Sequence, residues 1–236
     1  MIFARPLKYV LGRIVPFGQF ETINPINLGT GTADSNKFLN GDGLWANITG
    51  GDIDIDDFVF VSAKSDLPTP VSNVITLADN VTYYFTTTVD LLGDRLVGGE
   101  NTVILGASSE NSRIKSTGLG VGVALFTTEW TTPIRHVTFQ DVDTALDIDG
   151  SVNPPLALDW TGVNFLNVPN IGKIDTADNW IYSKGAFLNS QNLQFDGSHG
   201  TIGIDNSIFV GSGSAGNILD VLSTATITRR FRLIYS

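Results

Sequence analysis

The sequence predicts an all-β protein with a right-handed parallel β-helix, a solenoid of stacked coils, and three observations support this fold class. Residues 137–142, VTFQDV, place an apolar residue, a polar residue, an aromatic residue and then Asp or Asn before another apolar residue, and residues 163–168 repeat that order. The chain holds 20 Asp and 25 Gly but four Glu and six Lys, so helix formers are scarce and turn formers abundant. From residue 74 onward, short apolar runs alternate with clusters of Gly, Asn, Asp and Ser.

The spacing of the repeats separates two all-β folds. Val137 and Val163 are 26 positions apart, Val163 and Leu193 are 30 apart, and weaker copies of the pattern occur at residues 193–196 and 208–209. Short strands of this kind occur both in a sandwich of hairpins and in a parallel β-helix with three strands per turn. The repeats favour the β-helix, because a hairpin meander need not restore the same order of side chains after each circuit.

Short strands are expected at residues 74–77, 82–85, 94–97, 102–105, 113–115 and 124–126. The last stretch, residues 225–236, alternates so that Ile227, Phe231, Leu233 and Tyr235 share one face. An uncovered last coil would expose unpaired backbone and apolar core. Either another subunit covers it or the natural chain continues beyond Ser236, and we favour the second interpretation.

Composition excludes several classes of function. The chain of 236 residues has no Cys, so disulfides and thiolate metal sites are excluded. Its net charge of −10 argues against nucleic-acid binding, which needs clustered Lys and Arg. No stretch approaches the roughly 20 apolar residues of a membrane-spanning helix, so membrane insertion is not expected. No cofactor is indicated.

Residues 1–25 are expected to form an N-terminal docking arm. Residues 1–20 hold three basic residues and no acidic one, and these basic residues interrupt every apolar run, which argues against a secretory signal. The arm is too apolar for an idle tail and too short to build a core, so we expect it to order on a larger partner rather than fray. The expected docking residues are Phe3, Arg5, Lys8, Tyr9, Arg13, Phe17 and Phe20.

Residues 26–70 are expected to form a linker and turn region, and residues 71–236 the β-helix. Gly41, Asp42 and Gly43 predict a tight hairpin or turn between apolar flanks. Residues 62–70 contain two Pro residues, which is typical of a domain boundary. The alternating acids of residues 52–57 do not fit a calcium loop, which needs Gly and Glu where this chain has Asp57 and Ala63, so a solvated strand face is expected.

Residues 29–46 resemble a segment widespread in bacteriophage tail fibres and related virion appendages. Six residues carry this resemblance: Phe38, Leu39, Gly41, Asp42, Gly43 and Trp45. Leu44 departs from the more usual small polar residue without disturbing the turn. The resemblance implies a structural segment in a homotrimer and assigns no catalytic residue. From Asp66 to the end, the texture of the sequence is also similar to the pectate-lyase-like β-helices of phage tail spikes.

Six carboxylates could serve a glycan-cleaving enzyme, because rungs about 4.8 Å apart bring acids to the spacing that glycoside hydrolysis needs. They are Asp141, Asp143, Asp147, Asp149, Asp159 and Asp196. Asp is also favoured at the corners of such a fold, where its side chain bonds to backbone. The corner explanation is the stronger one, so we expect no enzyme.

Other chemistry-bearing residues have simpler explanations. His136 and His199 lack the spacing of a catalytic triad or zinc site. The glycine-rich residues 118–122 are not followed by a helix and fail as a phosphate loop. Core packing explains the remaining aromatic candidates for sugar stacking, which are Trp130, Trp160, Trp180 and Tyr182.

The function expected from the sequence is a structural component of a phage virion, a trimeric tail fibre or spike. Its N-terminus would attach to other tail or capsid proteins, and its shaft would contribute to adhesion through a host surface receptor or glycan. The alternatives are a head fibre or capsid decoration protein, and a polysaccharide depolymerase acting on host surface glycans.

Overall fold

In the computed structural model the chain forms two compact units, residues 1–54 and 55–236. The structure describes residues 58–210 and 217–234 in full and, before them, the backbone of four short strands. These four are β1 (Leu7–Val10), β2 (Arg13–Pro16), β3 (Lys37–Leu39) and β4 (Trp45–Asn47). β1 pairs antiparallel with β2, and β3 with β4.

The hairpin expected around the fibre-like segment is confirmed by its strands, because Leu39 in β3 pairs with Trp45 in β4. Gly41, Asp42 and Gly43 lie outside the described residues, as do residues 52–57. Of the expected docking residues, Lys8, Tyr9 and Arg13 fall in β1 and β2. The other four, Phe3, Arg5, Phe17 and Phe20, lie outside the described residues.

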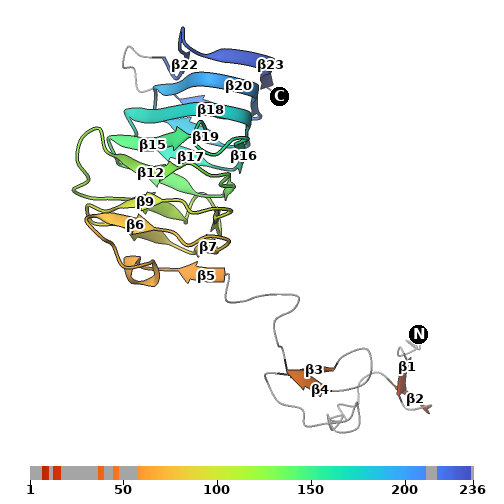
Figure 1. Ribbon diagram of the computed structural model, residues 1–236. Helices are drawn as coiled ribbons and strands as arrows, with labels where there is room; N and C mark the ends of the chain where they lie inside the picture. Colours follow the sequence, from red (N-terminus) through yellow and green to blue (C-terminus); the bar gives the residue numbers. More distant parts are fainter. Residues whose placement is uncertain are drawn as a thin grey trace. The chain divides into compact units, whose positions relative to one another are not determined.

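The second unit is a parallel β-solenoid of about seven coils, in which all pairings between the described strands are parallel (Figure 1). This arrangement confirms the stacked array and excludes the hairpin sandwich. The coils place their strands in three columns. The first column holds β5 (Phe58–Val61), β7 (Thr82–Phe85), β10 (Val103–Gly106), β13 (Ile134–Arg135), β16 (Ala157–Thr161), the second halves of β18 (Asn170–Ser183) and β20 (Leu193–Asp205), and β23 (Thr226–Ile234).

The other two columns complete each coil. The second column holds β8 (Thr88–Asp90), β11 (Arg113–Lys115), β14 (Thr138–Gln140), β17 (Asn164–Leu166), β19 (Ala186–Leu188) and β21 (Ile208–Val210). The third column holds β6 (Val74–Thr76), β9 (Arg95–Val97), β12 (Ala124–Thr128), β15 (Thr144–Asp149), the first halves of β18 and β20, and β22 (Leu219–Val221). One short 3₁₀ helix, η3 (Lys64–Asp66), lies in the first coil. Within the described residues, no helix has the length and apolar character needed to cross a bilayer.

All six strands expected between residues 74 and 126 are present, with ends shifted by at most two residues. Two features of the strand pattern differ from expectation. β5 pairs with β7, so the solenoid sheet already includes residue 58, on the N-terminal side of the expected boundary. The weak repeat at residues 193–196 lies in the third column, whereas the repeats at Val137 and Val163 precede strands of the second column. The next copy in that column is β19, which pairs with β17.

A ladder of stacked aromatic rings fills the core behind the second column. Phe139, Phe165, Phe187 and Phe209 are in register, one on each of four successive coils. Their ring centroids lie 5.7, 5.5 and 4.8 Å apart in sequence order, with interplanar angles of 16°, 26° and 7°. Such offset stacking is favourable beyond the burial of area, so the repeated Phe both marks the coil and holds it to its neighbours.

A second ladder runs along the corner between the second and third columns. Asp141, Asn167 and Asn189 each have a left-handed backbone, with φ of 52°, 56° and 50°. Asn and Asp adopt this conformation more readily than other side chains, because their short polar groups bond locally. The Asn167 amide donates to Asp141 Oδ1 (2.8 Å), and the Asn189 amide donates to Asn167 Oδ1 (3.0 Å). This ladder explains why the sequence repeat ends in Asp or Asn.

Candidate ligand-binding groove

The outer face of the third column carries a groove made of two adjoining pockets. The first has a volume of about 700 Å³ and crosses strands from β6 to β20, and the second has a volume of about 400 Å³ and lies beside β12. Arg95 and Asp147 line both pockets, which makes them one continuous groove. Hollows of this size are typical of ligand sites.

One wall of the groove is a loop that most coils lack. Eight residues, 116–123, connect β11 with β12, whereas three connect β14 with β15 and three connect β17 with β18. The backbone N–H of Gly122 donates to Asp143 Oδ2 (2.8 Å), which ties the loop to the next coil. Leu119 and Val123 of this loop line the first pocket. Insertions in repeat proteins are commonly found on the binding face, so this loop indicates a functional surface.

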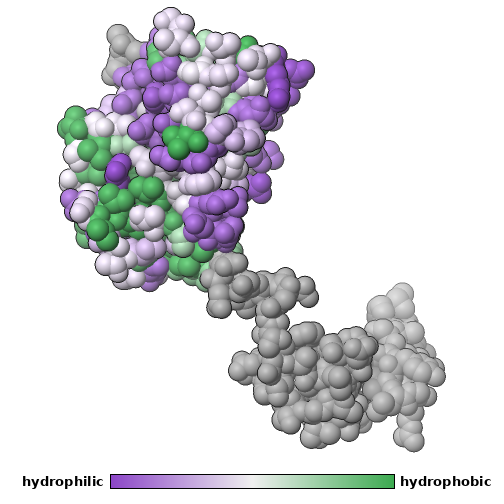
Figure 2. Space-filling model, in the orientation of Figure 1, coloured by the Kyte–Doolittle hydropathy of each residue, from purple (hydrophilic) through white to green (hydrophobic). Residues whose placement is uncertain are grey.

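The wall and its surroundings are apolar on the outside. Val121 is 87% exposed, and Val71 and Leu92 are also exposed. Figure 2 shows a hydrophobic area over the N-terminal coils on this face, next to a more polar surface over the later coils. The groove therefore offers an apolar rim and a polar floor.

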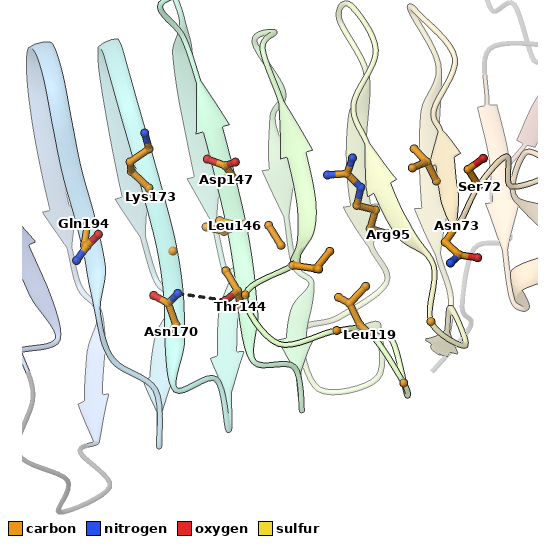
Figure 3. A pocket seen from close by; sticks show the side chains of 18 residues that line it. Ser72, Asn73, Arg95, Leu119, Thr144, Leu146, Asp147, Asn170, Lys173 and Gln194 are labelled. Carbon is orange, nitrogen blue, oxygen red and sulfur yellow. Dashed lines mark hydrogen bonds between the residues drawn. The ribbon is translucent and has the colours of Figure 1, made fainter.

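The polar floor is built from rungs in register. Asp147 on β15 aligns with Lys173 on β18 and with Gln194 on β20. Figure 3 shows Lys173, Asp147 and Arg95 pointing out on the same side of the sheet, from β18, β15 and β9. Neighbouring rungs lie about 4.8 Å apart, so Asp147, Lys173 and Gln194 form a row along the solenoid. Arg95 lies beside this row, two residues before Val97, which is the residue of β9 in register with Asp147.

Two of these charged side chains are available for a ligand. Among the described residues, the side chains of Arg95 and Asp147 make no hydrogen bond or ion pair. Lys173 differs, because its ammonium pairs with Asp175 (3.1 Å), and that hydrogen bond raises the Lys173 pKa despite partial burial. A charge already balanced by a neighbour contributes less to binding than a free one.

Asp196 is one of three carboxylates that form a row on this face. Asp149, Asp175 and Asp196 are in register on successive rungs. Thr224 Oγ1 donates to Asp196 (2.6 Å), and this bond together with one from Gly197 N lowers the Asp196 pKa. Asp196 is therefore engaged by its own coil.

Trp130 lines the second pocket, and its loop is held rigidly. The Trp130 backbone N–H donates to Thr128 Oγ1 (3.0 Å), and Thr132 Oγ1 donates to the Trp130 carbonyl (3.2 Å). Both Thr residues are buried. The half-buried Trp130 is thus fixed at the edge of the groove, together with Glu129 and Asp149.

The six candidate carboxylates separate into groups. Asp147, Asp149 and Asp196 face outward from the third column, whereas Asp141 belongs to the corner ladder and Asp143 anchors the loop. Asp159 lies on the first column and pairs with Arg135 (3.2 Å). The sequence did not single out the groove residues Arg95, Glu129, Asn170, Lys173 and Gln194. Asp recurs at one register position on three successive coils, at Asp149, Asp175 and Asp196. This recurrence is the feature of the sequence that could have identified the face that carries the groove.

The other candidates are placed mainly in the core. Trp160, Trp180 and Tyr182 are fully buried, as the packing explanation predicts, and burial raises the Tyr182 pKa well above its ordinary value. His199 is also buried, whereas His136 is exposed at a corner with φ of 56°. Within residues 58–210 and 217–234, no group of three or more His, Asp or Glu is placed to hold a metal ion.

The fold and groove define the chain as a parallel β-solenoid protein with a polar, apolar-rimmed groove on one column. No protein-family model, curated protein or solved structure matches the chain.

Proposed function

We propose that the protein is a structural component of a phage virion, a tail fibre or spike that attaches through its N-terminus and contributes to host-cell adhesion. The observation that carries the proposal is a parallel solenoid preceded by a separate unit that holds the fibre-like segment, residues 29–46. Parallel coils that share one continuous core make a stiff rod, which suits an appendage that must carry load. In this proposal the solenoid is right-handed and three copies assemble.

The proposal assigns attachment and adhesion to different parts of the chain. Residues 1–20 carry three basic residues and no acid, whereas the whole chain has a net charge of −10. Opposite charge on the two parts favours different partners. The N-terminal arm meets tail or capsid proteins, and the groove of the third column meets the host surface.

Deleting residues 1–25 tests the attachment. The shortened chain is expected to remain a folded, soluble trimer, measured by circular dichroism and light scattering, but to be absent from particles assembled in its presence. Loss of folding in the shortened chain would place the arm in the core and contradict the proposal. Labelling on intact particles separates a tail appendage from a head fibre.

A polysaccharide depolymerase is the second candidate, because Asp147 and Asp149 lie two residues apart on one strand and both line the groove. This spacing is about 6.6 Å along the strand, within the range of an inverting pair. Release of reducing ends from host capsule, lost in Asp147→Asn, would establish this activity. Its absence across a broad glycan panel would remove it.

A further inference from the structure

We propose that the groove of the third column binds an oligosaccharide made of neutral or amino sugars, with Trp130 as the stacking platform, and that it rejects acidic saccharides. The inference rests on the proposed role in host adhesion and names the chemical class of the receptor.

The shape of the groove fits an extended chain molecule. The residues of its first pocket come from six successive strands of the third column, β6, β9, β12, β15, β18 and β20, and the second pocket, with Trp130, adjoins it beside β12. Five steps of about 4.8 Å give roughly 24 Å along the solenoid. A compact ligand would fill only part of this length, whereas a saccharide chain contacts a new rung every few ångströms.

The lining fits sugar chemistry. Trp130 offers an aromatic face for the C–H groups of a sugar ring at one edge of the groove. Leu119 and Val123 form an apolar rim at the opposite edge, because they precede β12 whereas Trp130 follows it. Asn170 and Gln194 supply amide groups, while Asp147 accepts and Arg95 donates to hydroxyl groups. Because the loop of Trp130 is already fixed by Thr128 and Thr132, little conformational entropy is lost on binding.

Charge decides which saccharides enter. The groove is lined by three carboxylates, Glu129, Asp147 and Asp149, against two cations, of which Lys173 is already paired with Asp175. Arg95 is therefore the one uncommitted cation among the described lining residues. A polyanionic glycan would meet more carboxylates than cations on a chain of net charge −10, whereas neutral hydroxyl groups and protonated amines are accepted.

The test is an array of bacterial surface saccharides on which neutral, amino-sugar and acidic chains are printed side by side, probed with the labelled full chain at low salt. Retention is expected on neutral and amino-sugar spots and not on acidic ones. Trp130→Ala is expected to lower the signal about tenfold, and Asp147→Asn and Arg95→Gln about threefold to tenfold each. Arg135→Gln is the matched control, because Arg135 lies on the first column and should leave the signal unchanged.

Three results would overturn the inference: binding confined to acidic spots, no binding to any spot, or full binding by a folded Trp130→Ala variant. The location of the chain on the particle is measured separately. A chain that is found on virions but binds no saccharide refutes this inference and leaves the proposed function standing.

Discussion

At Gly172 the chain passes so close to the neighbouring coil that only glycine fits. Its φ is +112°, and a Cβ built at this position would overlap the Leu146 carbonyl oxygen. That oxygen belongs to backbone, which cannot move away without breaking the pairing of β15 with β18. Glycine is therefore required here by contact as well as by conformation.

Gly172→Ala is expected to lower the free energy of unfolding by about 2 kcal/mol or more. Gly118→Ala is the matched control, because Gly118 also has a positive φ (+89°) but a Cβ there would meet nothing within 4 Å. Gly118→Ala should lower the free energy of unfolding by only about 1 kcal/mol, the strain of a left-handed backbone at a residue other than glycine. Urea titrations of both variants measure the two changes in the free energy of unfolding. Equal changes would show that the close contact with Leu146 adds no cost of its own.

His199 makes the stability of the later coils depend on pH. The ring is buried, its Nδ1 accepts from the Ala177 N–H (3.3 Å), and its Nε2 lies 2.6 Å from the Asp196 carbonyl. Burial lowers the His199 pKa, and this effect outweighs the carbonyl of Asp196 and the charges of Asp175 and Asp196, which raise it. Protonation would also remove the acceptor that Ala177 uses.

Since the folded pKa of His199 lies below 6.5, the unfolded chain takes up this proton first as the pH falls. The stabilisation is complete above pH 6.5 and is lost as the pH falls from there through the folded pKa. His199→Asn keeps an acceptor for Ala177 and should flatten the dependence of the melting temperature on pH in this window. If the pH dependence of the melting temperature is the same in His199→Asn as in the unaltered chain, another group is responsible for it.

Among the elements, the corner ladder joins coils through side chains rather than backbone. Asn167 both donates to Asp141 and accepts from Asn189, so it is the central rung of the ladder. Asn167→Asp keeps the tolerance for left-handed backbone but replaces a donor with a second carboxylate beside Asp141. We expect a loss of about 1 kcal/mol at neutral pH, measured by thermal melting, because these bonds are exposed.

Asp141→Asn is the matched control for the ladder. Asn keeps the acceptor oxygen that Asn167 uses and the tolerance for a positive φ, and it gives up only an exposed hydrogen bond from Gln140, so the change should cost little stability. The same substitution should be silent in any glycan-cleaving assay, because Asp141 contacts Asn167 rather than the groove. A large loss of stability in Asp141→Asn would contradict the ladder as the explanation of the repeat.

The sequence could predict these elements because inward and outward residues alternate along each strand, and because the corners of the ladder require a left-handed backbone conformation. Tyr83 and Phe85 are buried and mark β7, and the Asp or Asn two residues after Phe139, Phe165 and Phe187 marks a corner. The register of later coils was harder to predict. β18 and β20 run through the corner between the third and first columns as single strands of 14 and 13 residues, and within these strands the corner is marked by the positive φ of Thr176 and Gly197 rather than by a break between two strands.

The groove was predictable only in part. Asp147, Asp149 and Asp196 are visible in the sequence as acids near strands, but their common face depends on coil lengths that differ from one coil of the third column to the next. Arg95 lies far away in sequence and joins Asp147 only through the stacking of three coils. Long-range register of this kind is set by packing in the core, which a local pattern does not specify.

At the scale of the whole molecule, we propose that the groove on the outer face of the solenoid binds the host surface and that the N-terminal docking arm, residues 1–25, attaches the protein to the particle. The solenoid core is continuous from coil to coil, so the groove is held on a rigid support. Because the docking arm is basic and the remainder of the chain is acidic, attachment should have an electrostatic component, and added salt should weaken the attachment.

The most direct test is electron cryomicroscopy of intact particles in which this chain is located by a label at its C-terminal end. We predict label on an external tail appendage, with three solenoids in each appendage and the label away from the site of attachment. Particles that lack the chain, or that hold it inside the head, would contradict the proposed role in attachment and adhesion.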